Sequence, residues 1–117
     1  MNRILYTILF AILFSFSAVA THQRAAEITY KHISGLTYEF TVIMYTKTSS
    51  PADDSRVVMP IFWGDDTGDE IERVYFSPIP EVNDISLNIY KGNHTFPGPA
   101  RYIVSVEDPN RNFGVLN

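Results

Sequence analysis

Short runs of β-forming residues recur along this chain, and turn residues separate each run from the next. The runs occupy residues 27–33, 37–45, 56–63, 70–76, 85–91 and 101–107, and a further apolar run begins at residues 113–116. Outside residues 1–20, no window has a helical period long enough to compete with this alternation. Six or seven short strands at such spacing predict an all-β fold, an antiparallel β-sandwich.

Alternation within the runs indicates which residues share a face of the sheet. In residues 37–45, one face carries Tyr38, Phe40, Val42 and Met44. In residues 85–91, Ile85, Leu87 and Ile89 face one way. Pro60 cannot donate a ladder hydrogen bond, so its strand is expected at an edge of the sheet or at a bulge.

The last apolar run, at residues 113–116, reaches almost to Asn117. A sandwich that lacked its final strand would leave an unpaired edge, which proteins normally avoid. Two alternatives follow: the final strand is very short, or the sequence is a fragment of a longer chain with its last strand truncated. We favour the fragment.

Residues 1–20 have the three parts of a secretory signal peptide. Arg3 supplies the positive charge, residues 4–14 form an uncharged apolar stretch, and AVA at residues 18–20 is a cleavage site. The alternative, an uncleaved membrane anchor, would need about 20 consecutive apolar residues. We therefore expect a signal-peptide helix that is cleaved off and a mature domain at residues 21–117. That domain is exported to the outer cell surface or the extracellular space and is not embedded in the membrane.

Charge and cysteine content exclude several functions. The chain has a formal net charge of −4. Cleavage removes only Arg3 of its nine basic residues, which leaves eight basic against thirteen acidic residues and a net charge of −5. Nucleic acid is not expected as a partner, because binding it requires a basic surface. The chain has no cysteine, which excludes a disulfide scaffold, a thiol nucleophile and a thiolate zinc site.

Two segments together resemble the PKD-type domain, an immunoglobulin-like β-sandwich common in bacterial surface and secreted proteins. The first is IFWGDDT at residues 61–67, similar to the family's signature of an aromatic residue, Trp and Gly-Asp-Gly. The second runs from HTFPG at residues 94–98 to YIVSVED at residues 102–108. The resemblance implies structural roles for Trp63, Gly64, Asp65, His94, Phe96, Gly98, Tyr102 and Asp108.

Several of these residues have a physical role without the family. A large aromatic such as Trp63 on a central strand fills a two-sheet core, and Tyr102 can tie the corner of a sandwich through its hydroxyl. We expect the ring of His94 to bond a backbone carbonyl. Asp66 stands where the family has its second Gly, so we expect a looser turn there.

The start of the mature chain looks like the N-terminal region of large exported proteins of Bacteroidetes-type bacteria that are associated with gliding motility. The similar segments are EITY at residues 27–30 and GLTYEFTV at residues 35–42. In those proteins a PKD-like module follows the mature start, and a C-terminal sorting domain comes much later. The resemblance implies that this chain is one module of a larger protein.

Two sequence patterns match known functional motifs, and neither is expected to be functional here. DTG at residues 66–68 is the triplet of aspartic proteases, which need two such carboxylates sharing a proton; here flanking charges would crowd the site. NHT at residues 93–95 matches an N-glycosylation site, which matters only in a eukaryotic secretory pathway. We expect no enzyme activity.

Acidic side chains gather in the same turn. Asp65, Asp66 and Asp69 are candidates for Ca²⁺, which prefers carboxylate oxygens, but EF-hand spacing is absent and a solvated acidic turn explains them. The three histidines, His22, His32 and His94, have no metal-ligand spacing. We expect no cofactor.

Aromatic side chains are the remaining candidates for ligand contact, because they stack on sugars and on protein partners. They are Tyr30, Tyr45, Tyr75, Phe76 and Tyr90. The expected function is a non-catalytic spacer, adhesion or interaction domain, with neighbouring domains of the same chain or surface proteins as partners. The alternative is a carbohydrate-binding accessory module of a secreted hydrolase, with glycans as ligands.

Overall fold

The computed structural model of the chain describes residues 23–50 and 55–107, which form six β-strands and no helix. The strands are β1 (Gln23–Ser34), β2 (Thr37–Lys47), β3 (Val58–Phe62), β4 (Gly68–Pro78), β5 (Ile85–Thr95) and β6 (Ser105–Val106). All of their pairings are antiparallel. The predicted all-β class is therefore confirmed. The expected signal-peptide helix and the apolar run at residues 113–116 lie outside the described residues.

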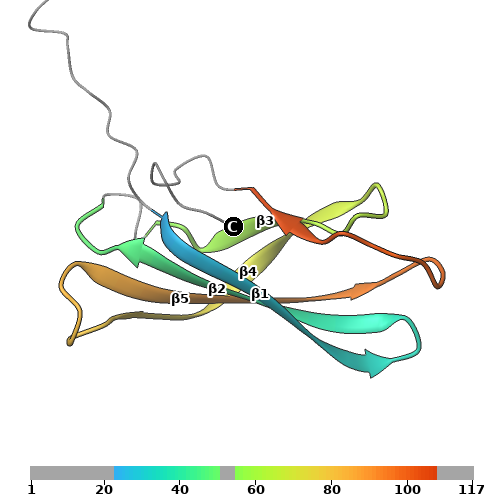
Figure 1. Cartoon of the computed structure of the whole chain (residues 1–117), viewed down its shortest axis with the longest axis horizontal. Helices are drawn as coiled ribbons and strands as arrows, with labels where there is room; N and C mark the ends of the chain where they lie inside the picture. Colours follow the sequence, from blue (N-terminus) through green and yellow to red (C-terminus); the bar gives the residue numbers. More distant parts are fainter. Residues whose placement is uncertain (1–22, 51–54, 108–117) are drawn as a thin grey trace, which may run out of the picture.

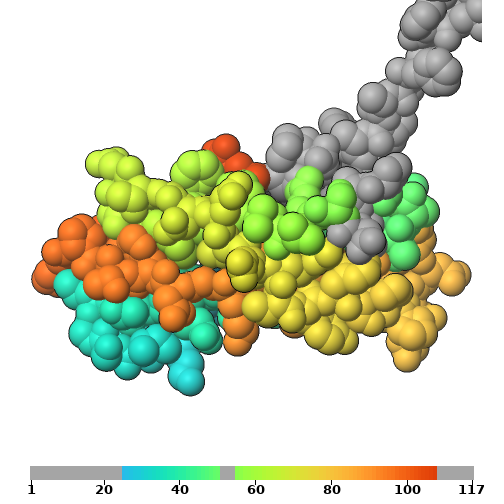
Figure 2. All heavy atoms as spheres, turned by 180° about the vertical axis from the view of Figure 1, so that it is seen from behind, coloured from blue at the N-terminus to red at the C-terminus, as the bar shows by residue number. Residues whose placement is uncertain are grey.

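The strands are joined in the order β1-β2-β5-β4-β3-β6, and β4 belongs to both halves of the sheet. Residues 68–72 of β4 pair with β3, and residues 72–78 pair with β5. A register shift between Arg73 and Tyr75 separates the two parts, and such a bulge bends a strand. The sheet thereby folds over, so that β3 and β6 lie above β1, β2 and β5 (Figure 1). Seen from behind, β4 (yellow) crosses the molecule between β3 (green) and β5 (orange) (Figure 2).

The core lies between these two layers. Its buried side chains are Phe40, Val42, Met44, Met59, Ile61, Trp63, Ile71, Tyr90 and Phe96. Phe40, Val42 and Met44 alternate along β2 with less buried residues, and Tyr38 packs against the same cluster. The face predicted for residues 37–45 is therefore confirmed, and it is the inner face of the lower layer.

β5 turns its polar residues toward the core. Ser86, Asn88 and Tyr90 are fully buried, whereas Ile85, Leu87 and Ile89 are half-buried on the opposite, outer face. Asn88 Nδ2 donates to Thr46 Oγ1 at 2.8 Å, and Arg73 Nη1 donates to Asn88 Oδ1 at 3.0 Å. These hydrogen bonds satisfy amide and hydroxyl groups that would otherwise be costly to bury.

β5 also extends further than the sequence predicts, through residues 92–95, which were expected to form a turn. Gly92 pairs with Phe40 within the strand. An added Cβ at Gly92 would lie 2.2 Å from Cγ2 of Ile71. The glycine therefore marks a close approach between β5 and β4 and not a chain reversal.

The strand expected at residues 101–107 is shorter than predicted. Of residues 101–107, only Ser105 and Val106 pair as a strand, and they meet β3 at Phe62 and Ile61. Pro60 has β4 on one side and lies beyond the reach of β6 on the other. The expectation that this strand lies at an edge of the sheet or at a bulge is wrong, because β3 lies between β4 and β6 and its register with β4 is unbroken at Pro60; the proline is tolerated because, among the described residues, only β4 pairs with it. The described residues contain no helix long and apolar enough to cross a membrane.

Candidate functional site

A tight turn between β3 and β4 carries the first PKD-like motif. Gly64 and Asp66 have φ angles of 82° and 66°, in the left-handed region that Gly and Asp adopt more readily than most residues. The Thr67 amide donates to Asp65 Oδ1 at 3.1 Å, and the Trp63 amide donates to the Thr67 carbonyl at 3.0 Å. The expectation of a looser turn is wrong, because Asp66 itself adopts the left-handed conformation that the turn requires.

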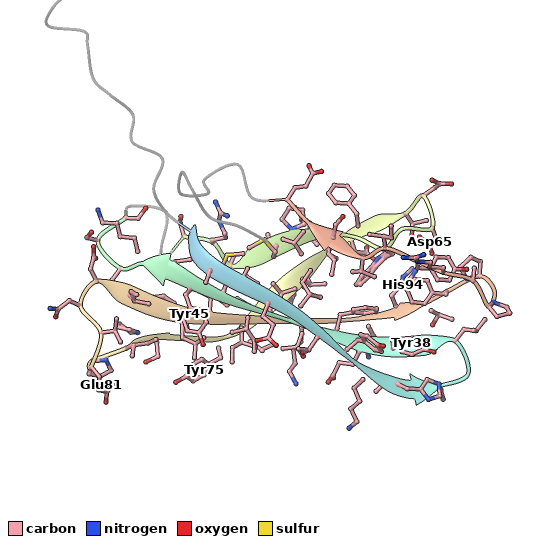
Figure 3. All side chains as sticks on the ribbon, viewed as in Figure 1. Tyr38, Tyr45, Asp65, Tyr75, Glu81 and His94 are labelled. Atoms are coloured by element: carbon pink, nitrogen blue, oxygen red, sulfur yellow. The ribbon has the colours of Figure 1, made fainter. Side chains whose placement is uncertain are left out.

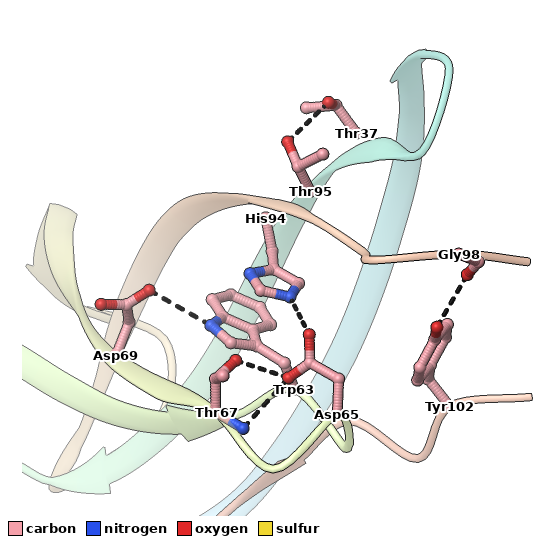
Figure 4. A network of polar contacts seen from close by, with 9 residues as sticks. All are labelled: Thr37, Trp63, Asp65, Thr67, Asp69, His94, Thr95, Gly98 and Tyr102. Atoms are coloured by element: carbon pink, nitrogen blue, oxygen red, sulfur yellow. Dashed lines mark hydrogen bonds and ion pairs between the residues drawn. The ribbon is translucent and has the colours of Figure 1, made fainter. Parts of the chain in front are cut away.

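The indole of Trp63 is fully buried where the two layers meet. The ring of His94, from β5, stacks on it with centroids 4.5 Å apart and planes at 8° (Figure 4). Phe40 of β2 lies 5.0 Å away on centroids, and the indole Nε1 donates to Asp69 Oδ2 at 3.2 Å. Trp63 thus fills the core and also has its one polar atom satisfied, as a buried indole requires.

His94 and Asp65 form a nearly buried pair at this site. His94 Nε2 lies 2.7 Å from Asp65 Oδ2, and the two side chains are 13% and 5% exposed. The Thr67 hydroxyl bonded to the other carboxylate oxygen lowers the pKa of Asp65, and the Thr67 amide and His94 act in the same direction against desolvation. The expectation that His94 bonds a backbone carbonyl is wrong, because a carboxylate from the adjacent turn reaches the ring.

Tyr102 ties the segment that leads into β6. Its hydroxyl donates to the Gly98 carbonyl at 2.7 Å, which is the corner bond expected for this residue. The ring stacks on Phe96 with centroids 4.3 Å apart and planes at 16°. The Phe96 amide in turn donates to the Leu36 carbonyl at 3.0 Å, so this corner is attached to the turn between β1 and β2.

The structure therefore brings most of the motif residues together. Trp63, Asp65 and His94 form one cluster, and Phe96, Gly98 and Tyr102 form the next, with the rings of His94 and Phe96 4.7 Å apart. Asp108 lies outside the described residues. Asp65 and His94 are 29 positions apart in the sequence, so no short-range spacing rule predicts their contact. The only sequence signal was that both belong to the resembling segments.

The carboxylates of the turn do not assemble a metal site. Asp65 is engaged by Thr67 and His94, Asp69 accepts from the indole of Trp63, and Asp66 is exposed. Within residues 23–50 and 55–107, no three His, Cys, Asp or Glu side chains lie close enough to hold an ion. The three calcium candidates are thus held as structural acceptors or left in solvent.

The aromatic candidates divide between surface and core. Tyr30, Tyr45 and Tyr75 are 72%, 36% and 49% exposed. Tyr90 is fully buried and donates its hydroxyl to the Arg56 carbonyl at 2.9 Å, so the interpretation of Tyr90 as an exposed residue is wrong. Phe76 is half-buried beneath the guanidinium of Arg73, 4.6 Å from its centroid.

An apolar patch covers the outer face of the lower layer, and we call it the outer patch. It consists of Ile43, Tyr45, Tyr75, Ile85, Leu87 and Ile89. The strand register places Ile89 between Ile43 and Tyr75, and Leu87 beside Tyr45. Tyr45 and Tyr75 both project from this face in Figure 3. The sequence showed that the three residues of β5 share a face but not that this face points outward.

The chain was compared with known protein families, curated proteins and solved structures, and none of them matches it.

Proposed function

We propose that this chain is a non-catalytic, PKD-like module of a larger exported bacterial protein, and that it docks against a neighbouring β-sandwich domain through the outer patch. The observation that carries the proposal is a contiguous apolar patch on one sheet face, in which exposed Tyr45 and Tyr75 lie beside half-buried aliphatic side chains. Such patches mark interaction surfaces when a soluble domain exposes them. The signal-peptide pattern at residues 1–20 supports the exported location.

The rim of the outer patch supports docking to a protein. Lys91 pairs with Glu39 at 3.5 Å, and Lys47 lies 3.9 Å from Asp84. In each pair a carboxylate offsets the positive charge of the lysine. The outer patch therefore has an apolar centre and a polar rim, as a typical protein interface has. The immunoglobulin-like type is supported by the folded-over strand order and by the corner bond of Tyr102. The resemblance to gliding-motility-associated proteins makes a tandem module of a surface protein the proposed setting.

Export is tested with the full chain expressed in a Gram-negative host and carrying a C-terminal epitope. The proposal expects a chain that begins at Thr21, found outside the cytoplasm, as measured by fractionation and mass spectrometry of the N-terminus. A chain that keeps Met1 and stays in the cytoplasm would contradict export. A variant with Ala18 and Ala20 both changed to Arg is the control, since charges at the cleavage site should block processing.

Docking is tested by crosslinking in the producing organism. A photoreactive amino acid in place of Tyr75 is expected to form adducts with another domain of the same surface protein. The same residue in place of Glu81, which is exposed in the loop before β5, should form far fewer adducts (Figure 3). Equal adduct yields from both positions would contradict an interface at the outer patch.

The alternative function, carbohydrate binding, is favoured by one observation. Tyr45 and Tyr75 lie on the same exposed face, and aromatic rings stack on sugars. Under this alternative, the mature domain is retained on cellulose, chitin or peptidoglycan, and Tyr45→Ser or Tyr75→Ser abolishes retention while Tyr30→Ser does not. An absence of retention on all three polymers favours the protein-docking proposal.

A further inference from the structure

β1 forms one end of the sheet, and among the described residues it pairs only with β2 (blue in Figure 1). Between register shifts at its two ends, residues 25–32 pair with β2 without interruption. Residues 25–34 are all exposed, and none of them is a proline. Folded proteins usually protect such an edge from other strands with prolines, bulges or charged side chains. The central part of β1 has only its charges for this purpose, so their placement decides whether another strand is repelled or attracted.

The two charged residues in this part of β1, Glu27 and Lys31, are of opposite sign and lie two positions on either side of Thr29. Side chains alternate along a strand, so all three residues share the outer face of the sheet. Within residues 23–50 and 55–107, neither charged side chain has an ionic partner. Lys31 lies opposite Glu39 in the register, but that carboxylate is bonded by Lys91 at 3.5 Å. Both charges of β1 are therefore available to a second molecule.

Two copies of β1 match each other in one antiparallel register. With a two-fold axis at Thr29, each Glu27 lies opposite the partner's Lys31, so the ion pair forms twice. A shift of two residues is the smallest that keeps the faces of both strands, and it would place Glu27 opposite Thr29 or Ile33 and open both pairs. Opposite charges that face each other across strands stabilise a sheet, and like charges destabilise it. The charges therefore select the register that is centred on Thr29.

The same register covers apolar side chains on the inner face of β1. Ile28 and Tyr30 are 37% and 72% exposed there, and both line a groove of about 540 Å³ beside the core. Each Tyr30 lies opposite the partner's Ile28, and such aromatic and β-branched pairs stabilise antiparallel strands. The Thr29 hydroxyls face each other across the axis, as those of Thr37 and Thr95 do at 2.7 Å between β2 and β5. Apolar contact and hydrogen bonding thus favour the register that the charges select.

We propose that the chain forms a two-fold symmetric homodimer, in which residues 26–32 of β1 pair with the same residues of a second copy about Thr29. The two sheets then form one continuous sheet. A two-fold axis uses the same surface on both molecules, which is the commonest arrangement of soluble homo-oligomers. The partner is a second copy because the charge pattern of β1 is complementary to its own reversal. The inference does not rest on the outer patch, which lies on β2, β4 and β5, so the two proposals can fail separately.

Charge reversal tests the dimer, with the chain purified as the cell produces it and its oligomeric state measured by sedimentation velocity. The natural chain is expected to dimerise. Lys31→Glu or Glu27→Lys places like charges opposite each other twice, and each is expected to weaken dimerisation roughly tenfold. An equal mixture of the two variants should restore dimers, because each chain then meets opposite charges, and this restoration also shows that both variants fold.

Glu81→Lys is the matched control for net charge, because Glu81 is exposed in a loop away from β1, and it should leave dimerisation unchanged. A natural chain that stays monomeric at millimolar concentration would overturn the proposal. Dimers that persist undiminished in both single variants would overturn it too, and so would a mixture that stays monomeric.

Single cysteines test the register, since the natural chain has no cysteine. Thr29→Cys is expected to give disulfide-linked dimers under mild oxidation, because opposing Cα atoms in antiparallel strands lie about 4.5–5.5 Å apart, within reach of a disulfide. Ala25→Cys is the matched control, because Ala25 is exposed on the same strand and face but would lie roughly 27 Å from its copy. Non-reducing electrophoresis measures both yields. No crosslink at Thr29, or equal yields at both positions, would overturn the proposal.

Tyr75→Ser separates this dimer from contacts of the outer patch. Combined with Thr29→Cys, it should leave the yield of crosslinked dimers unchanged, because Tyr75 lies on β4 and not on the β1 edge. Loss of the crosslink in this double variant would overturn the proposal by assigning the dimer to the outer patch.

Discussion

At the scale of single residues, the turn after β3 shows how one carboxylate can organise a cluster. Asp65 accepts from Thr67 with one oxygen and contacts His94 with the other. It thereby fixes both the turn and the imidazole ring that stacks on Trp63. Because the folded state holds this carboxyl in its charged form, the pKa of Asp65 is lowered from its ordinary value of 3.8.

This lowered pKa makes part of the stability depend on pH. A carboxyl with a lower pKa in the folded state contributes stability above its unfolded pKa and loses it as the pH falls through the folded value. We therefore expect the thermal unfolding midpoint of the chain to decrease as the pH is lowered below about 3.8. The midpoint of Asp65→Asn should decrease less steeply over the same pH range. Asp66→Asn, an exposed neighbour in the same turn, should keep the natural slope. A natural slope in Asp65→Asn would contradict the role of this carboxylate.

Gly35 and Gly64 both have a left-handed backbone, but only Gly64 is also closely packed against other atoms. Comparing the two positions therefore distinguishes the effect of backbone strain from the effect of packing. Gly35 has φ of 53° with no atom within 4 Å of an added Cβ, whereas at Gly64 that Cβ would lie 2.5 Å from the Ile103 carbonyl oxygen. We expect Gly35→Ala to lower the free energy of unfolding by about 1 kcal/mol through strain alone. Gly64→Ala should lower it by about 3 kcal/mol or more, because a backbone atom must also move. Urea denaturation measures both, and equal effects would contradict the close approach at Gly64.

At the scale of elements, β4 and β5 show where sequence reasoning succeeds and where it stops. The alternation in residues 37–45 predicted the buried face of β2, since a period of two is distinctive when one face is apolar. The same alternation in β5 was ambiguous. One face carries Ile85, Leu87 and Ile89, whereas the face that is buried carries Tyr90 and two polar residues, Ser86 and Asn88. The amide of Asn88 is hydrogen-bonded to Thr46 in the core. Nothing local in β4 signals that it changes partner strand near Arg73, since that bend arises from pairing with both neighbours.

The crossing of β4 over β5 depends on Gly92. Gly92→Ala would drive its Cβ into Ile71, which is 4% exposed, and we expect overpacking to cost about 1–3 kcal/mol. Ile71→Ala alone should cost about 2–5 kcal/mol through the cavity that it leaves. In the double variant the two changes compensate, so we expect a loss smaller than their sum by more than about 0.5 kcal/mol.

Chemical denaturation of the four proteins measures this coupling between Gly92 and Ile71. Gly98→Ala is the control, because its added Cβ meets nothing within 4 Å, and its effect should stay within about 0.5 kcal/mol. Strictly additive losses at Gly92 and Ile71 would show that the two strands do not cross as closely as described.

At the scale of the whole molecule, the candidate site could be predicted in part. The resembling segments identified Trp63, His94 and Tyr102 as structural residues, and the structure gathers them at one end of the fold. The contact of His94 with Asp65 and the exposure of the outer patch could not be predicted. Both depend on which strands become neighbours, and neither the cysteine-free sequence nor the described residues, which are all strands and turns, offer a local marker of strand order.

The shared strand β4 also predicts how the molecule unfolds. Because β4 pairs with both layers and Trp63 contacts Phe40 and His94 of the opposite layer, neither layer has a core of its own. We therefore expect a single cooperative transition. Trp63 is the one tryptophan of the chain, so its fluorescence reports the upper layer, while far-ultraviolet circular dichroism weights the long strands of the lower layer. The urea curves from the two probes should coincide, and they should still coincide in Tyr75→Ser, where only the outer patch changes. Separate midpoints would mean that the upper layer detaches first, and that the two layers are not one folding unit.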